Sequence, residues 1–120
     1  MRMWMVDPKT MCRRHLLGEH CEIHMIVGSI LKKKQLDGFV DKNCLEFRSI
    51  GPRHEALVAE MLRRKYKHNS FLPEFVEFEA TEKVVYSRVD RRASLIELRR
   101  RCPECRKLGL IFANICQEES

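Results

Sequence analysis

Apolar residues recur at helical spacing in the first third of the chain. Four of them fall on one stripe of a 3.6-residue period, which is the face that would meet a core: Leu16, Ile23, Val27 and Ile30. Asp7-Pro8 is typical of a helix start, because the aspartate accepts backbone N–H bonds and the proline presets φ in the first turn. The pattern predicts one long helix from Asp7-Pro8 to about Lys34.

Two further helices are predicted. Gly51-Pro52 opens a segment that runs to about Tyr66, and its apolar face is made of Leu57, Val58, Met61 and Leu62. Ser87 or Asp90 can cap a third helix that ends at Arg101, before Pro103. Residues 39–48 are expected to be irregular and residues 75–86 to form a loop. The predicted fold is therefore all-α, a compact single domain of about three helices around one core.

Length and charge narrow the class of protein. A chain of 120 residues is long enough for one modest core. Lys and Arg outnumber Asp and Glu by 23 to 17, and an excess of positive charge favours polyanionic partners, with nucleic acid ahead of acidic membrane. The apolar runs are too short for a signal peptide or a membrane span, so we expect a cytoplasmic protein with no membrane association. Residues 1–101 are expected to form the helical domain and residues 102–120 a divergent tail.

A polar stripe lies beside the apolar stripe of the first helix. His15, Glu19 and Glu22 are spaced i, i+4, i+7, which places them at the edge of the core. A carboxylate there can act in acid/base chemistry because burial raises its pKa, although a salt-bridged helix face is the simpler alternative. Gly18 is unfavourable in a helix, so we expect another backbone, such as the apolar amino-terminal hexapeptide, to approach it closely.

Two basic runs are candidates for phosphate contacts. One is at the end of the second helix, at Arg63, Arg64, Lys65 and Lys67, and the other is Arg99-Arg100-Arg101. Solvated helix ends are the alternative interpretation.

The six cysteines are expected to be reduced, since no secretory signal accompanies them. Cys102-Pro-Glu-Cys105 has the spacing of half a tetrahedral zinc site, but the chain holds no second cysteine pair. Cys116 or a histidine could complete such a site. Two ordinary thiols near a helix end remain the simpler interpretation, and we expect no metal.

Several of these residues together resemble a known family. Met1-Arg2, His15-Leu16-Leu17-Gly18-Glu19-His20 and Glu22 resemble the start of the pyrimidine-dimer DNA glycosylases of the phage endonuclease V type. Arg53-His54-Glu55, Met61-Leu62-Arg63-Arg64 and Tyr66-Lys67-His68 resemble the second helix of that family and the turn after it. The resemblance covers roughly the first 70 residues.

The resemblance implies an enzyme that repairs DNA. It implies an all-helical domain with an extended amino-terminal segment between the helices, and a glycosylase with coupled abasic-site lyase activity that needs no metal or cofactor. Met1, through its α-amine, and Glu22 would be catalytic. Arg2, His15 and Glu19 match positions near the DNA, and the substrate would be double-stranded damaged DNA whose target base is extruded. No obligatory protein partner is implied, so we expect a monomer.

Three features refine this expectation. An α-amine is roughly a third neutral near pH 7.5, whereas a lysine amine is neutral in about one molecule per thousand, so a free terminus can serve as the nucleophile without tuning. The bulky Arg2 should prevent removal of Met1. Cys21 and Met25 stand where the family's prototype carries arginines that grip the substrate, so the resemblance supports the lyase chemistry more strongly than the pyrimidine-dimer preference.

Two alternatives remain open at this point. The chain could be a non-catalytic basic nucleic-acid-binding domain of the same fold, or a zinc-stabilised interaction domain built on Cys102 and Cys105.

Overall fold

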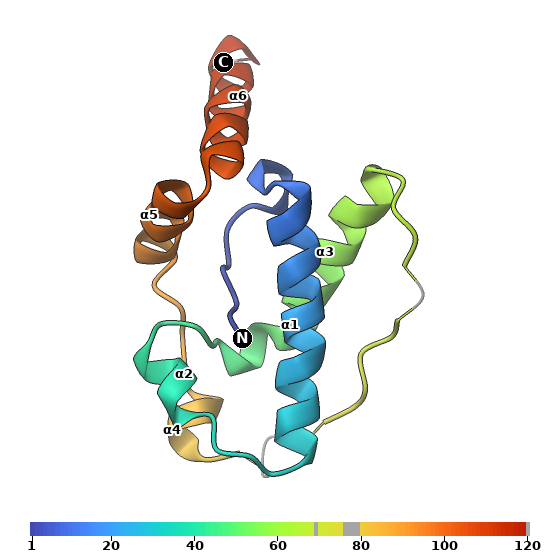
Figure 1. Cartoon of the computed structure of the whole chain (residues 1–120), viewed down its shortest axis with the longest axis vertical. Helices are drawn as coiled ribbons and strands as arrows, with labels where there is room; N and C mark the ends of the chain where they lie inside the picture. Colours follow the sequence, from blue (N-terminus) through green and yellow to red (C-terminus); the bar gives the residue numbers. More distant parts are fainter. Residues whose placement is uncertain (69, 76–79, 120) are drawn as a thin grey trace.

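The computed structural model describes residues 1–68, 70–75 and 80–119, with side chains as far as Phe112. Within these residues the chain is helical and contains no strand, which confirms the all-α prediction. The elements in chain order are η1 (Pro8–Thr10), α1 (Arg13–Leu31), α2 (Asp37–Asp41), η2 (Phe47–Ser49), α3 (Ile50–Arg63), α4 (Glu82–Val85), α5 (Arg91–Arg101) and α6 (Pro103–Glu119). Figure 1 shows α1 and α3 side by side, with α5 on the other side of α1.

The predicted first helix is in fact two elements. Asp7 caps only the short η1, by accepting a hydrogen bond from the Lys9 backbone N–H. Met11 and Cys12 are extended, and α1 then starts with Cys12 as its N-cap, whose sulfur accepts from the His15 N–H. The break has a packing reason, because it turns the Met11 side chain into the core, where it is completely buried. The predicted apolar stripe of α1 is buried as expected.

The other predicted helices are close to the observed ones. Helix α3 ends at Arg63 rather than near Tyr66, and Lys65 follows it in the left-handed region with φ 66°. Leu62 was placed on the wrong face, since it is 58% exposed. Asp90 caps α5 as predicted, by accepting from the Ala93 N–H.

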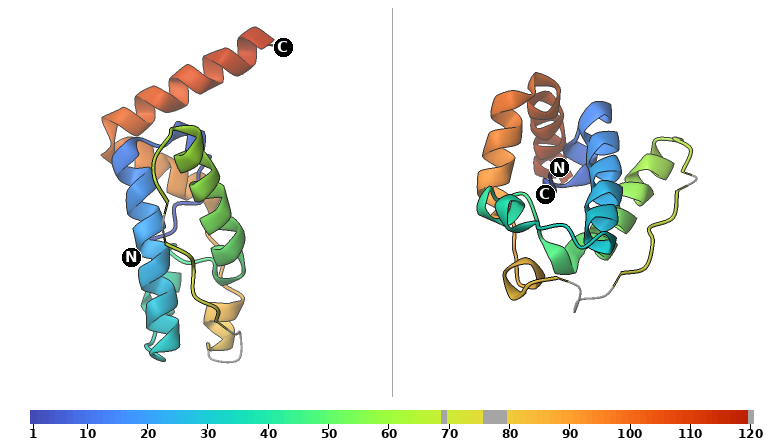
Figure 2. Two further views of the ribbon diagram at one scale, coloured as in Figure 1. Left: turned by 90° about the vertical axis from the view of Figure 1, so that its right-hand side faces the viewer. Right: turned by 60° about the horizontal axis from the view of Figure 1, so that its bottom comes forward.

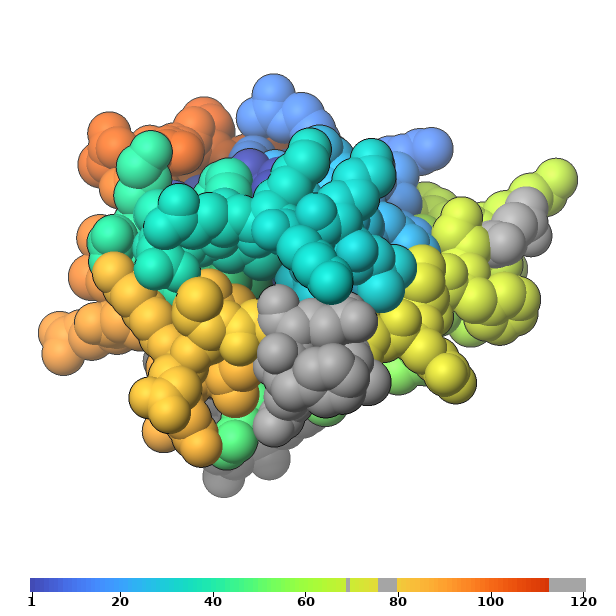
Figure 3. Space-filling model, turned by 90° about the horizontal axis from the view of Figure 1, so that it is seen from below, coloured from blue at the N-terminus to red at the C-terminus, as the bar shows by residue number. Residues whose placement is uncertain are grey.

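Four elements arise where none was predicted: α2, η2, α4 and α6. Helix α2 is joined to α4 by an ion pair between Asp41 and Lys83 and by a hydrogen bond from Thr81 to Asp37. Seen from below, the segment after α1 and the α4 region cover the same face of the molecule, in cyan and gold respectively (Figure 3). These helices are short, so their periodicity was too brief to read from the sequence.

The amino-terminal segment is extended and lies inside the molecule. The Met3 N–H donates to the Cys44 carbonyl at 2.7 Å, and the Ser94 hydroxyl donates to the Trp4 carbonyl. The side chains of Met3, Trp4 and Val6 are buried in the core. Figure 1 shows the segment running between α1 and α5 toward the middle of the molecule, as predicted. Met1, at the start of this segment, is partly buried and lies beside α1 at the edge of the molecule in the left view of Figure 2.

Helix α6 occupies the region predicted as a tail. It packs against α5 and η1 and lies across the end of the molecule where α1 begins and α3 ends (Figure 2). Among the described residues, no helix has the length and apolar character to cross a membrane.

Candidate active site

A cleft of about 690 Å³ opens beside α1, next to the first residues of the amino-terminal segment. Its walls come from that segment, α1, the α2 region and the end of α5. The lining residues are Met1, Arg2, Trp4, Arg14, His15, Gly18, Glu19, Glu22, Phe39, Lys42, Cys44 and Arg101. The two residues predicted to be catalytic, Met1 and Glu22, thus share one cleft although 20 residues separate them in the chain.

Met1 and Arg2 are positioned by the residues that follow them. Met3 is anchored to the Cys44 carbonyl, so the first two residues have little freedom. The Arg2 guanidinium stacks on the Trp4 ring at 3.8 Å from its centroid, a cation–π contact. The Arg2 Nε is buried and has no hydrogen-bond partner among the described residues. A cation is therefore held at the cleft by the Trp4 ring.

Glu22 is partly buried in α1, and its surroundings shift its proton affinity. Burial raises the pKa of Glu22 above its ordinary value of 4.5, and the negative charge of Glu19 adds to this. The positive charge of the Met1 amine and a backbone hydrogen bond from Arg2 oppose the rise. The amine and the carboxylate are therefore electrostatically coupled, and Glu22 can exchange a proton more readily near neutral pH than an ordinary glutamate.

Gly18 lines the same cleft, which corrects one expectation. No backbone approaches it, because a Cβ built at Gly18 would meet no atom within 4 Å among the described residues. The missing side chain instead leaves space in the wall of the cleft, one turn of α1 before Glu22.

Glu19 lies at the base of the cleft but is not free to act there. It is 1% exposed, and the Arg53 guanidinium donates to both its carboxylate oxygens, at 2.6 and 3.0 Å. This buried bidentate pair links α1 to α3. The structure thus gives Glu19 a partner inside the protein, and contact with DNA stays a prediction for it.

His15 lies at the edge of the cleft with one face toward Trp4. The two rings meet edge to face at a centroid distance of 5.9 Å. Burial, and to a lesser extent the charge of Arg14, lowers the pKa of His15, which favours a neutral ring. The His15 Nδ1 faces the thiols of Cys12 and Cys105.

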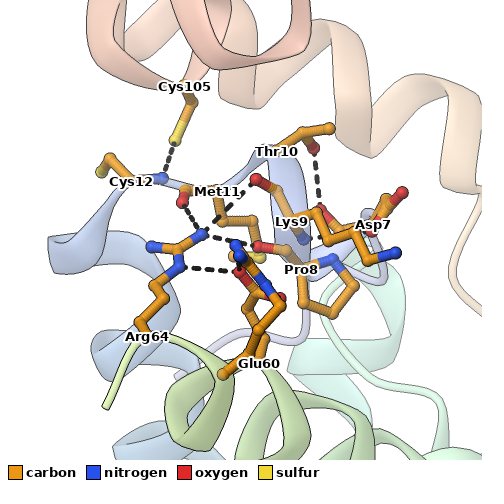
Figure 4. Close-up of polar contacts among 10 residues, drawn as sticks. Asp7, Pro8, Lys9, Thr10, Met11, Cys12, Glu60, Arg64 and Cys105 are labelled. Carbon is orange, nitrogen blue, oxygen red and sulfur yellow. Dashed lines mark hydrogen bonds and ion pairs between the residues drawn. The ribbon is translucent and has the colours of Figure 1, made fainter. Parts of the chain in front are cut away.

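The basic run after α3 lies outside the cleft. Arg64 donates from Nε to Glu60 and from Nη2 to the carbonyls of Pro8 and Met11, at 3.0 and 2.7 Å, so it ties η1 to α3 (Figure 4). Arg63 also pairs with Glu60, and hydrogen bonds from Arg63 and then Arg64 hold the pKa of Glu60 below its usual range.

Lys65 and Lys67 are exposed. The structure therefore does not bring any of the four residues predicted in this run next to Met1.

Three cations of the cleft escaped the sequence analysis as a group: Arg14, Lys42 and Arg101. Arg101 belongs to a basic run that was noted, but Arg14 and Lys42 carry no motif. Their common position depends on how the α2 region and α5 fold over α1. For Arg14, the sequence offered one signal, which is that it directly precedes the candidate residue His15. Nothing comparable marks Lys42.

Among the side chains that the structure describes, two groups have the composition of metal sites, and neither includes Met1 or Glu22. One is Cys12, His15, Cys102 and Cys105, and the other is His20, His24, His54 and His68.

The site is a cleft of a small all-α domain that is lined by Met1, Glu22 and several cations. The family model of pyrimidine dimer DNA glycosylases matches residues 1–74, more than half of the chain, and the chain belongs to this family. Membership indicates a DNA glycosylase of pyrimidine dimers, with DNA as its substrate. Comparison with curated proteins and with solved structures found no match.

Proposed function

We propose that this glycosylase also cleaves the DNA strand, as an abasic-site lyase that works through an imine formed by the α-amine of Met1. The observation that carries the proposal is that Met1 and Glu22 line one cleft and that the charge of the amine acts on the carboxylate. An amine nucleophile and an acid/base group within one site are the two elements that this reaction needs.

The reaction begins with attack of the neutral Met1 nitrogen on the sugar C1′ of the damaged nucleotide. The C1′–base bond breaks, and the electron pair leaves with the base, which takes up a proton. Opening of the sugar ring then gives an imine between Met1 and C1′. Loss of a proton from C2′ drives elimination of the 3′ phosphate oxygen, which breaks the strand. Water finally hydrolyses the imine and frees Met1.

Glu22 is proposed as the acid/base group of these steps. Its carboxylate stabilises positive charge that develops on the sugar and then accepts the C2′ proton. Its raised pKa suits the second role, because a more basic carboxylate accepts the C2′ proton more readily.

The cations of the cleft are proposed to hold the DNA backbone around the extruded nucleotide. Arg2, Arg14 and Lys42, from three different segments of the chain, contribute positive charge to the cleft that Met1 lines. The open wall at Gly18 leaves room for part of the substrate. No metal takes part in this chemistry.

Borohydride trapping tests the proposal. Incubation with borohydride should reduce the imine and give a covalent complex on duplexes that contain either a cyclobutane pyrimidine dimer or an abasic site. The protein must carry a native, untagged terminus. Absence of a trapped complex on both duplexes would exclude the imine mechanism.

The variant Glu22→Gln separates catalysis from binding. It should bind the damaged duplex with nearly unchanged affinity and lose strand cleavage. Cleavage at the wild-type rate would remove Glu22 from the mechanism. A wild-type protein that binds damaged duplex without cutting it would instead support a non-catalytic binding domain of this fold.

A further inference from the structure

Cys12, His15, Cys102 and Cys105 meet at the start of α1. Cys12 and His15 flank the first turn of that helix, Cys102 separates α5 from α6, and Cys105 lies in the first turn of α6. Their three Sγ atoms and one imidazole nitrogen all lie within 4.8 Å of one another. Cys102 and Cys105 are buried, each at 2% exposure. Residues 90 positions apart are thus gathered around one point.

Two of the three separations below are close to the edges of a zinc tetrahedron. Zinc binds sulfur at about 2.3 Å and imidazole nitrogen at about 2.0 Å, so the edges are about 3.8 Å between sulfurs and about 3.5 Å between sulfur and nitrogen. The Cys12 and Cys102 sulfurs are 3.8 Å apart, and the Cys105 sulfur is 3.7 Å from His15 Nδ1. The Cys12 sulfur is 3.1 Å from the same nitrogen.

Backbone N–H groups point at all three sulfurs. Each of the three sulfurs accepts a backbone N–H: Cys105 from Cys12 at 3.2 Å, Cys102 from Cys105 at 3.4 Å, and Cys12 from His15 at 3.5 Å. The first of these is visible in Figure 4. Such bonds orient metal ligands and stabilise their negative charge. A hollow beside Cys12 and Cys102 gives an ion access from solvent.

We propose that these four residues bind one zinc ion. The ligands form two pairs of equal spacing, Cys12-Arg-Arg-His15 and Cys102-Pro-Glu-Cys105, as in structural zinc sites. The second pair was missed in the sequence because one of its members is a histidine. Four protein ligands leave no open position, so the ion is structural and fastens α5 and α6 to the family-matched residues. It also fixes the proton of His15 on Nε2, which becomes a donor at the cleft.

A second cluster carries a similar inference on different observations. His20 and His24 are one turn apart on α1, His54 lies on α3, and His68 follows that helix. Their Nε2 atoms are all buried and have no hydrogen-bond partner among the described residues. One nitrogen from each ring lies within 4.8 Å of the others. Burying four imidazole nitrogens close together without partners lowers the stability of the fold unless a group between them binds them.

The outer side of His54 shows the arrangement expected of a ligand. Its Nδ1 is 3.1 Å from a carboxylate oxygen of Glu55, while its Nε2 is buried without a hydrogen-bond partner among the described residues. A metal-binding histidine commonly donates its other N–H to a carboxylate in this way. Burial, followed by the charges of His54, His24 and His68, lowers the pKa of His20 to about 4, so the ring is neutral at physiological pH.

We infer that the histidine cluster, defined as His20, His24, His54 and His68, binds a second zinc ion. Imidazole nitrogens suit zinc, and the site joins α1, α3 and the chain after α3. Neither ion lies on Met1 or Glu22, so metal content can be measured independently of strand cleavage, and failure of the imine mechanism would not affect this result.

Metal analysis of untagged full-length protein, purified without chelator from zinc-containing medium, tests both sites. Two zinc ions per chain are expected. If the wild-type protein holds one ion per chain, the site whose double variant, described next, still holds one zinc would be overturned. Protein without bound zinc would overturn both sites. Iron with inorganic sulfide in place of zinc would overturn the proposal for the cysteine site.

Variants assign the ions. The double variant Cys102→Ser with Cys105→Ser should lose the zinc of the cysteine site and keep that of the histidine cluster. The double variant His20→Ala with His24→Ala should lose the zinc of the histidine cluster and keep the other. Each double variant is the control for the other. Cys21→Ser is the matched control, because Cys21 is an exposed cysteine of α1 outside both clusters and its variant should keep both ions.

Cobalt substitution covers the case in which a variant does not fold. Wild-type protein stripped of metal and titrated with Co²⁺ should develop thiolate-to-cobalt charge-transfer absorption in the near ultraviolet during the binding of one ion. A second ion should add visible absorption without that band, because the histidine cluster holds no thiolate. A titration with no charge-transfer band would overturn the cysteine site, and saturation at that one ion would overturn the histidine site.

Discussion

Gly18 shows how one residue can trade stability for function. A glycine inside a helix lowers stability by about 1 kcal/mol relative to alanine. Yet a Cβ at Gly18 would clash with no nearby atom. Gly18→Ala should therefore raise the free energy of unfolding by about 1 kcal/mol in a denaturant titration. Gly18→Leu should project into the cleft and reduce both DNA affinity and strand cleavage.

Gly28 provides the matched control for this prediction. It also lies in α1 with no atom within 4 Å of a built Cβ, but it does not line the cleft. Gly28→Leu should leave strand cleavage unchanged. Equal loss of cleavage in the two leucine variants would show that the effect at Gly18 comes from the helix and not from the cleft.

Glu22 should carry a stability penalty that its function requires. Because burial raises its pKa in the folded state, the folded protein holds the Glu22 proton more tightly than the unfolded chain. The penalty is absent below the ordinary pKa of 4.5, develops as pH rises toward the folded pKa, and is complete above it. Glu22→Gln should therefore be more stable than wild type at neutral pH.

Chemical denaturation across the acid range measures this effect. The difference between Glu22→Gln and wild type should shrink as pH falls through the window above 4.5. A stability difference that does not change with pH would contradict the raised pKa.

The pair of Glu19 and Arg53 acts at the level of elements, because it fastens α1 to α3. Both side chains are buried, at 0% and 6% exposure, and the contact is bidentate. Removing one partner leaves the other charged and buried, so Glu19→Leu or Arg53→Met should lower the free energy of unfolding by about 3–5 kcal/mol.

Combining the two changes separates structure from DNA contact. The double variant Glu19→Leu with Arg53→Met should regain much of the lost stability, because no unpaired charge remains. If Glu19 contacts DNA as the family resemblance implies, the refolded double variant will still bind DNA weakly. Wild-type affinity in that variant would limit Glu19 to its structural role.

The long elements could be predicted from the sequence, and the short ones could not. The stripe from Leu16 to Ile30 and the cap at Asp90 are local signals, so α1 and α5 were placed well. The break at Met11 depends on tertiary burial, which a periodic pattern cannot reveal. Helix α6 was missed because its first turns are anchored by Cys102 and Cys105, whose partners lie at the other end of the chain.

The candidate site was predictable only through family resemblance. Spacing on α1 made Glu22 a modest candidate, but no local pattern links it to Met1 or to Lys42 across the cleft. The sequence did not predict the cluster of four histidines either, because no local pattern links them. His54 and His68 lie near α1 only once α3 has packed against it. Contacts between distant segments thus define both the cleft and the metal clusters.

At the scale of the whole molecule, the net charge of +6 should make DNA binding depend on salt. If Arg14 and Lys42 hold phosphates at the cleft, then Arg14→Gln and Lys42→Gln should each weaken binding and reduce the slope of log affinity against log salt by about 1. Fluorescence anisotropy at several salt concentrations measures both quantities.

Lys33→Gln is the control for charge alone. Lys33 is exposed beyond the end of α1 and does not line the cleft. Its variant should change the slope by much less than either cleft variant. Equal slopes for all three would mean that overall charge, and not the cleft, determines DNA affinity.

The central claim is that the α-amine of Met1 attacks the DNA, and the location of the trapped adduct tests it most directly. After borohydride reduction and digestion, mass spectrometry should find the sugar adduct on the peptide that begins with Met1. One residue added before Met1 should abolish trapping while binding persists. An adduct on the Lys42 side chain, the other amine that lines the cleft, would contradict the mechanism.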